Sequence, residues 1–500
     1  WGTPIPVWIC PDCGTEHCIG SISEMEEMKT ADSPMPPELH RPYVDEVKLN
    51  CPTSDCSGEM VREPYVMDCW FDSGCASFAQ WHYPFENQDK FDGAFPVDYI
   101  CEAVDQTRGW FYSLMAVSTT VFDSISYRRC LSLGHILDKD GKKMSKSRGN
   151  VVNPWDHFNK EGSDSIRWYM MTQSAPWSPT NFDSNGVRES YAKMFLTLWN
   201  VHRFHADYAA LDGFDADDAD GFVAVADRSP LDRWILSRLH TVANSYHDHF
   251  VDWDFHKAGR ELEAFVVNDL SNWYVRRSRR RLWDEADSLD KRACQHTLHE
   301  VLLTVCRLMA PVAPFMPDQI HRDLTGVSVH LADWPVGSSL LESNLPPQDW
   351  ALEQEMELVR ALAETGRRVR VDADRRQRLP CRAGWIVGGP DIGRFHDLLA
   401  DELNVESLTT EDDLERFQRM VVEPNRKALG KKCRQDLPAV IALLGEAEPD
   451  NLLLEIDAGI CILEGYDITM DDIEIRRVEK DGFAASTISD ENVGDVSLVL

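Results

Sequence analysis

The sequence predicts an α/β domain with a cysteine-rich knuckle, followed by a helical bundle and a small C-terminal α/β region. Three observations favour this class. Two close cysteine pairs lie in the first 56 residues, apolar runs of strand and helix length alternate between about 97 and 172, and helical periodicity dominates from about 186 to 330. A length of 500 residues allows about three domains of roughly 150 residues each.

The first segment, residues 1–67, is expected to be irregular, with proline-rich turns and cysteines near both ends. Paired thiolates at C-x2-C and C-x4-C spacing can close a tetrahedral zinc site, and four thiolates leave no open position, so the zinc would be structural. Cys18, and less so His17, are rival ligands, and buried structural cysteines are the alternative. The expected ligands are Cys10, Cys13, Cys51 and Cys56.

Residues 68–180 are typical of one half of a parallel α/β domain. Short apolar runs alternate there with helix-length segments, as in βαβ units. The expected order is a strand at Val97–Cys101, a helix at Thr107–Val121, a strand at Leu131–Leu137 and a helix at Ser163–Thr172.

A lysine-rich loop follows the second of these strands. The whole chain has only 15 lysines, and four of them fall within residues 139–146, among glycines and serines. Compact ammonium groups, hydroxyls and backbone N–H groups suit a polyphosphate, and nucleotides bind at this end of parallel strands. A solvated basic turn is the alternative interpretation.

Residues 181–350 are expected to form a helical bundle. Ser229 and Pro230 make a typical helix start, and Pro311 and Pro314 a typical stop. Residues 335–350 are expected to be a linker. The last part, 351–500, should begin with a helix to about 369 and continue from 381 as mixed short strands and helices.

The net charge of −33 should repel nucleic acid except where basic residues concentrate. The acids are spread along the chain, lysine is scarce and arginine is retained, which we interpret as a salt-adapted surface. No apolar run reaches the roughly 18 residues of a membrane span. The scattered cysteines among apolar neighbours indicate reduced thiols, so a cytoplasmic protein with no membrane partner is expected.

Three stretches carry a family resemblance. The loop Lys-Met-Ser-Lys-Ser at 143–147 matches the signature loop of class I aminoacyl-tRNA synthetases, within the setting "GHILDKDGKKMSKSRGNVVNPWD". The segments "WGTPIPVWIC" and "REPYVMDCWFDSG" resemble the return from the editing insertion of isoleucyl-tRNA synthetases. The discriminating segment, "EAVDQTRGWF" at 102–111, resembles the isoleucyl pattern, whereas the valyl and leucyl branches carry other residues there.

The resemblance implies a Rossmann-like catalytic half-domain and substrate-binding roles for five residues. Glu102 and Asp105 would bond the ribose region of the aminoacyl-adenylate, and Gln106 would contact the ammonium group of the amino acid. Trp70 and Trp110 would line the aliphatic pocket. The alternatives are helix-dipole complementation for the two acids and ordinary core positions for the two tryptophans.

The same resemblance places the lysine loop at ATP. Lys146 first and Lys143 second would stabilise charge on the departing pyrophosphate during adenylate formation. Ser145 would join them, while Gly134 and His135 would lie against the adenine.

The densest basic run lies within the helical bundle, which corresponds to the anticodon-binding domain of the family. Residues 273–283 place five arginines beside three aromatic side chains. Arginine stacks on bases and pairs with phosphates, so the run could contact tRNA. The alternative is that these arginines join helices through Asp269, Asp284 and Glu285.

The resemblance covers the given chain but only the second half of such an enzyme, because the His-x-Gly-His signature is absent. We therefore expect the C-terminal half of a monomeric isoleucine–tRNA ligase, of archaeal and specifically haloarchaeal type. It would use isoleucine, tRNA(Ile), ATP with Mg²⁺ and a structural Zn²⁺, and the fragment alone would be inactive. A valyl-tRNA synthetase fragment and a non-catalytic RNA-binding module are the alternatives.

Overall fold

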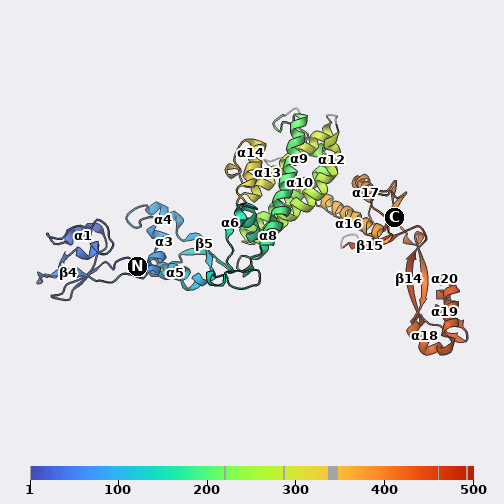
Figure 1. The fold of residues 1–500 in the computed structure, drawn as a ribbon, viewed down its shortest axis with the longest axis horizontal. Coiled ribbons are helices and arrows are strands. Elements are labelled where there is room, and N and C mark those ends of the chain that lie inside the picture. Colours follow the sequence, from blue (N-terminus) through green and yellow to red (C-terminus); the bar gives the residue numbers. More distant parts are fainter. Residues whose placement is uncertain are drawn as a thin grey trace. The chain divides into compact units, whose positions relative to one another are not determined.

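The computed structural model describes residues 2–218, 221–284, 288–335, 347–390, 392–459, 461–490 and 494–500 (Figure 1). The chain forms two compact units. The first contains the residues up to Leu196 together with Tyr246–Glu263 and Met309–Met316. The second contains Thr197–Ser245, Ala264–Leu308 and Pro317–Leu500.

The first unit begins with a small antiparallel sheet of strand order β2-β1-β4-β3. Trp8 and Met60 are buried in its core, and the Trp8 indole donates to the Val47 carbonyl at 2.7 Å. The prediction that residues 1–67 are irregular is therefore wrong. The strands have two to four residues each, too few to show a recognisable alternation of polar and apolar residues. The elements are β1 (Val7–Ile9), β2 (Glu16–Cys18), α1 (Ile22–Met28), β3 (Leu49–Asn50) and β4 (Glu59–Arg62).

The predicted parallel pair is confirmed as β5 (Val97–Ala103) and β6 (Tyr127–Leu133). The second strand begins four residues earlier than predicted, because the exposed Arg128 and Arg129 hide its start in an apolar pattern. It also ends before Gly134, and residues 136–137 form a separate strand. The connecting helix α5 (Trp110–Phe122) starts late because the 3₁₀ turn η2 (Val104–Arg108) precedes it.

The first unit contains further helices and a further pair of strands. The predicted helix after the lysine loop is confirmed as α7 and runs one residue further than predicted. A second parallel pair joins β7 to β8. The elements are α2 (Cys69–Gly74), α3 (Ala76–Ala79), α4 (Gln88–Ala94), β7 (Ile136–Leu137), α6 (Pro154–Phe158), α7 (Ser163–Gln173), β8 (Thr180–Asn181) and α8 (Ser184–Ser190).

The second unit contains the predicted helical bundle, drawn in green to yellow in Figure 1. The predicted start is confirmed: α10 begins at Pro230, and the Ser229 hydroxyl accepts the Asp232 N–H at 3.2 Å. The predicted stop is also confirmed, since α13 ends before Pro311. The helices are α9 (Thr197–Asp212), α10 (Pro230–Val251), the π-helical η6 (Phe265–Val275), α12 (Arg276–Trp283), α13 (Leu289–Met309) and α14 (Met316–Thr325). The last residues of α10 and α13 and the first residue of α14 are counted with the first unit.

One buried carboxylate joins three of these helices. The side chain of Asp232, on α10, is fully buried, and it accepts two hydrogen bonds from Arg281 of α12, at 2.7 and 2.8 Å. Its oxygens also accept the hydroxyls of Tyr274, on η6, and of Ser229. Because every one of these donors is directed at a single anion, the bundle has one defined packing here.

The last part of the unit begins with α16 (Trp350–Asp372), close to the predicted 351–369. Residues 336–346 of the predicted linker lie outside the described residues. The predicted mixture of strands and helices is confirmed. It comprises a sheet of order β10-β9-β16-β15 and an antiparallel ribbon of β11 and β14 beside α18–α20. The elements are β9 (Gly384–Val387), α17 (His396–Leu403), β10 (Leu408–Glu411), β11 (Gln418–Pro424), α18 (Arg426–Cys433), α19 (Leu437–Glu446), α20 (Pro449–Asp457), β12 (Ile462–Leu463), β13 (Tyr466–Asp467), β14 (Ile473–Glu479), β15 (Ala485–Asp490) and β16 (Gly494–Val499).

Among the helices of the described residues, none combines the length and the apolar character that crossing a membrane requires. None of the fourteen cysteines, all of which lie within the described residues, forms a disulfide bond.

Three histidines of the second unit enclose Phe214. Its ring lies 5.7 Å from that of His205, 4.9 Å from that of His296 and 6.1 Å from that of His299. Burial lowers the pKa of all three, to about 3 for His205 and about 4 for His299, and repulsion from neighbouring histidines adds to the effect at His205 and His299. The folded state therefore holds these rings neutral at pH values where the unfolded chain protonates them.

We expect the second unit to lose stability as the pH falls below about 6.5. The unfolded chain then binds protons, whereas the buried histidines of the folded chain stay neutral. At about pH 5.5 the loss is roughly 1.5 kcal/mol for each fully buried histidine. Urea unfolding at pH 7.5 and 5.5, followed by tryptophan fluorescence, measures it. His205→Phe should reduce the pH dependence, whereas His82→Asn, at an exposed position, should not. An identical loss in wild type and His205→Phe would contradict this explanation.

Candidate functional site

The four predicted zinc ligands converge in the N-terminal module of the first unit. The Sγ atoms of Cys10 and Cys56 lie 3.6 Å apart, as do those of Cys13 and Cys51, and all four lie within 4.8 Å of one another. Tetrahedral zinc with Zn–S bonds of about 2.3 Å requires sulfurs about 3.8 Å apart. The donor set and its spacing therefore fit a closed zinc site.

The turns around the cysteines leave little room for other side chains. A Cβ at Gly58 would lie 2.7 Å from the Cys10 sulfur and 2.6 Å from a carboxylate oxygen of Asp12, so glycine is required there. The rival ligands lie elsewhere. His17 hydrogen-bonds Glu24 at 2.9 Å, and Cys18 pairs with Val7 across the sheet.

The predicted polar substrate residues lie at the carboxyl ends of the parallel strands. Ala103 pairs with Leu133, so Glu102 on β5 and Gly134 after β6 share one edge. A Cβ at Gly134 would lie 2.2 Å from the Ser178 carbonyl oxygen, and the Gly134 N–H donates to the Pro176 carbonyl at 2.9 Å. Glycine is thus needed here for close packing of the backbone at the sheet edge.

Gln106 and the two tryptophans form one cluster. The side-chain amide oxygen (Oε1) of Gln106 accepts the Trp110 backbone N–H at 3.0 Å, and its amide nitrogen donates to the Asp105 carboxylate at 3.3 Å. The Trp70 ring lies against Gly109, while the Trp110 indole donates to the Ser73 carbonyl at 3.0 Å. Trp70 is 45% exposed, whereas Trp110 is half-buried and packs against the core cluster of Ile100, Phe111 and Leu114.

The lysine loop is held by two residues that the sequence analysis did not single out. Asp138 accepts the backbone N–H groups of Asp140 and Lys142, at 3.1 and 2.8 Å, and the Asn150 amide at 2.7 Å. Asn150 in turn accepts the Ser145 N–H at 2.9 Å. The hydrogen bond from Asn150 is the main reason that the pKa of Asp138 is lowered. The sequence did contain a signal for this. An Asp that lies two and four residues before the backbone N–H groups of a glycine-containing turn favours hydrogen bonds of this kind.

With the backbone fixed, the loop presents its cations to solvent. Lys143 and Lys146 are exposed, and within the described residues no ion pair or hydrogen bond engages either ammonium group. Ser145 and Ser147 share a hydrogen bond of 3.2 Å. His135 is exposed at the start of the loop, and its carbonyl accepts the Thr180 N–H. Such an arrangement can receive an anionic ligand without first breaking internal ion pairs.

The arginine run of the bundle is, by contrast, largely committed to internal pairs. Arg276 and Arg277 both contact Glu402, at 2.8 and 2.7 Å, and Arg281 is bound to Asp232. Of the predicted partners, Asp269 pairs with other arginines, Arg238 and Arg360, and Glu285 lies outside the described residues. Internal pairing therefore accounts for most of the run.

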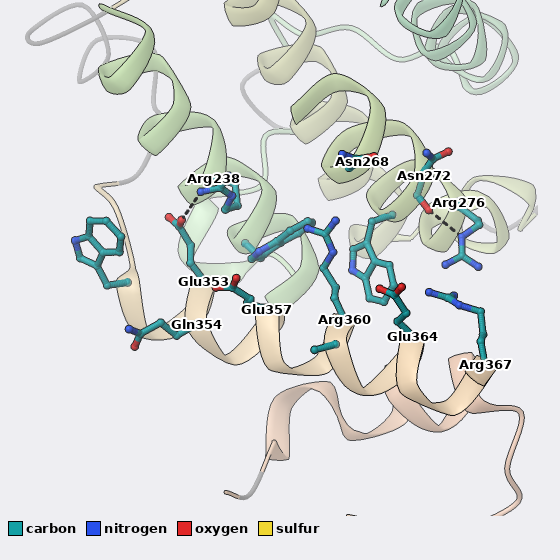
Figure 2. Close-up of a pocket in the computed structure, with 14 residues that line it drawn as sticks. Arg238, Asn268, Asn272, Arg276, Glu353, Gln354, Glu357, Arg360, Glu364 and Arg367 are labelled. Carbon is teal, nitrogen blue, oxygen red and sulfur yellow. Dashed lines mark hydrogen bonds and ion pairs between the residues drawn. The ribbon is translucent and has the colours of Figure 1, made fainter. Parts of the chain in front are cut away.

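A pocket of about 960 Å³ lies beside this run, and Figure 2 shows its lining side chains. Its cations are also paired: Arg238 contacts Glu353 at 3.1 Å, and Arg360 contacts Asp269 at 2.6 Å while lying over the rings of two tryptophans. The pocket is consequently close to charge balance and offers little free charge to a phosphate.

Comparison with known protein families gives two matches. Residues 1–183 match the family of tRNA synthetases class I (I, L, M and V), and residues 232–383 match the anticodon-binding domain of tRNA ligase. The lysine loop and the cysteine cluster lie within the first match, and the helical bundle lies largely within the second.

Relatives are found over nearly the whole chain. It is 41% identical over 482 residues to the isoleucine–tRNA ligase of Clostridium novyi, covering 95% of this chain and 45% of that protein. It is 39% identical over 513 residues to that of Clostridium acetobutylicum, covering 100% and 48%. It is 40% identical over 496 residues to that of Bacillus thuringiensis, covering 97% and 47%. The chain therefore spans about half the length of these relatives, and, because they are bacterial, they give no support to the archaeal type.

Among solved structures, the ternary complex LeuRS–tRNA–LeuAMS of Agrobacterium radiobacter K84 agnB2 matches with a TM-score of 0.50 and 18% identity. The match covers 71% of this chain and 41% of that one, and it shows a shared fold. Together these comparisons identify a chain that carries class I tRNA synthetase and anticodon-binding domain sequences and is homologous to isoleucine–tRNA ligases.

Proposed function

We propose that the whole protein is an isoleucine–tRNA ligase, which activates isoleucine with ATP and Mg²⁺ and transfers it to tRNA(Ile). The observation that carries the proposal is homology of about 40% identity to isoleucine–tRNA ligases along 95% or more of this chain. The relatives named above favour isoleucine over the valyl alternative. The exposed, preorganised lysine loop favours catalysis over a purely RNA-binding module.

In this proposal the lysine loop acts on ATP. Lys146 and Lys143 stabilise the negative charge that accumulates on pyrophosphate as the isoleucine carboxylate attacks the α-phosphate, and Ser145 adds a hydrogen-bond donor. Gly134 and His135 lie at the sheet edge where an adenine would lie. The hydrogen bonds of Asp138 and Asn150 support this role, because they fix the loop before ATP binds.

The amino-acid site is proposed at the neighbouring cluster. Trp70 and Trp110 supply apolar surface for the isoleucine side chain, and Gln106 contacts its ammonium group. Glu102 and Asp105 then accept hydrogen bonds from the ribose of the adenylate. The proximity of Trp70, Gln106 and Trp110 around Gly109 supports this assignment.

Cys10, Cys13, Cys51 and Cys56 would hold one structural zinc, which would fasten the two ends of the N-terminal module together. The chain would be divided into four domains, at residues 1–67, 68–180, 181–350 and 351–500. A cytoplasmic monomer with a salt-adapted surface completes the proposal, supported by the net charge of −33 and the free thiols.

Isoleucine-dependent ATP–pyrophosphate exchange tests the function directly. The 500-residue chain alone should be inactive, because it has no His-x-Gly-His segment to bind ATP and because the active site of a doubly wound sheet lies between its two halves. Exchange should appear when this chain is joined to the rest of the protein. A joined protein that is inactive with isoleucine but active with valine, or with neither, would overturn the proposal.

In that complete protein, Lys146→Ala should slow adenylate formation roughly a hundredfold, equivalent to about 3 kcal/mol, with little change in isoleucine affinity. The ammonium group contacts charge that is largest in the transition state. Pre-steady-state kinetics measures the step, and Lys160→Ala, which removes an exposed lysine of the same unit, serves as the matched control. An effect confined to KM would refute the assigned role.

Purified, chelator-washed protein should contain one zinc per chain. The double variant Cys51→Ser, Cys56→Ser should lose the metal, because two of four thiolates are removed, whereas Cys18→Ser should retain it. Elemental analysis measures the content. Zinc that persists in the double variant would place the site elsewhere in the chain.

A further inference from the structure

The antiparallel ribbon of β11 and β14 lies beside α18–α20, in a part of the chain that neither family match covers (Figure 1). β11 pairs with β14 over its whole length and with no other strand of the described residues. Its second edge is therefore open. An open edge presents backbone groups with which another chain can pair.

The backbone groups that face the open edge follow from the pairing with β14. The Phe417 carbonyl accepts the Lys480 N–H, and the Asn425 N–H donates to the Asp472 carbonyl, both at 2.9 Å. Alternate residues of an antiparallel strand bond the partner strand, so the odd-numbered residues of β11 bond β14 and the even-numbered ones face away from it. Among the described residues, no hydrogen bond engages the backbone N–H or C=O of three of these outward-facing residues: Gln418, Met420 and Val422.

A groove of about 620 Å³ adjoins the strand, and five consecutive residues, 418–422, line one side of it. A groove over one face of a strand would be lined by alternate residues only, so this one follows the edge. The turn between α19 and α20 lines the opposite side. Gly445 and Ala447 in that turn are small, which leaves room for a main chain between the turn and the strand.

The groove carries an excess of positive charge. Three cations line it, Arg419, Arg477 and Lys480, and two acids, Glu415 and Glu448. Arg477 pairs with Glu415 at 3.5 Å, whereas Lys480 donates to backbone carbonyls at 2.9 and 3.1 Å. The Arg419 side chain is exposed, and in the described part of the chain it takes part in no ion pair and no hydrogen bond. A ligand with acidic groups therefore complements the groove.

We propose that the open edge of β11 binds an extended acidic peptide of a partner protein, which adds a third strand to the ribbon and lies between β11 and the α19–α20 turn. Another extended main chain supplies the alternating donors and acceptors that this edge lacks, and a polynucleotide does not. Residues 416–434 contain seven cations and one acid in a chain of net −33, which favours acidic side chains on the peptide. Pro424 has no N–H, so the pairing is confined to residues 418–422.

The test uses the complete protein and three fluorescein-labelled heptapeptides, with binding measured by anisotropy. The first peptide is Glu-Val-Thr-Val-Asp-Val-Glu, whose β-branched residues favour an extended chain. The second has lysine in place of each acid. The third is the first with four consecutive central backbone nitrogens methylated, which removes two N–H groups from each of its edges. The first should bind saturably, and each of the other two at least about tenfold more weakly.

Variants of the protein test the same two contributions. Met420→Pro removes an outward-facing N–H without removing a bond to β14, and it should weaken binding of the acidic peptide about tenfold. Met420→Leu keeps the N–H and should bind as wild type does. Arg419→Ala should weaken binding about threefold. Arg476→Ala changes the net charge equally, at an arginine already paired with Glu423, and should have no effect. Circular dichroism shows whether each variant is folded.

The inference fails if the acidic peptide does not bind at about 1 mM, or if the methylated peptide binds as well as the first, which would indicate attraction by charge alone. A dimer in sedimentation that Met420→Pro abolishes would assign the edge to a second copy of the chain. A labelled tRNA(Ile) transcript that binds wild type but not Met420→Pro would assign it to nucleic acid. Either result would overturn the peptide site.

This inference does not rest on the proposed function, because the edge lies outside both family matches. Isoleucine-dependent exchange should be unchanged in all four variants. If exchange is normal and no peptide binds, the peptide site fails and the enzyme assignment stands. If exchange is absent while the peptide binds and Met420→Pro weakens it, the enzyme assignment fails and the peptide site stands.

Discussion

The helical part of the molecule depends on the pairing of one buried carboxylate. Asp232 has no access to water, and its charge is balanced by the two-pronged contact with Arg281 and by the hydroxyls of Tyr274 and Ser229. A buried ion of this kind is costly when a partner is removed, so the helices that supply the donors must assemble together. The arginine run at 276–281 therefore has a structural explanation before any ligand is considered.

The sequence was most informative where local chemistry is independent of distant contacts. The four cysteines, the proline-marked ends of α10 and α13, and the lysine loop needed only spacing and residue type. It failed for residues 1–67, because strands of two to four residues owe their pairing to the sheet and not to their own pattern. The contact between Asp138 and Asn150 could not be predicted, because it spans twelve residues, although the Asp138 cap of the glycine turn carried a local signal.

Arginine pairing was the least predictable property. Composition showed that arginine outnumbers lysine, but whether a guanidinium is neutralised depends on which acid the fold brings to it. Glu402 is distant in sequence from Arg276 and Arg277 and yet contacts both, whereas Asp372 and Asp374 leave their neighbouring arginines unpaired. Charge density along the sequence therefore pointed to the run whose charge is already satisfied.

The buried Arg370 fixes the backbone of the loop that follows α16 without using the side chains that the loop exposes. Its hydrogen bonds, with those of Asn404, engage only backbone carbonyls. Substitutions at positions 375, 376 and 378 can then accumulate without disturbing the fold. The charge that this loop displays to solvent can therefore change while the course of its backbone stays the same.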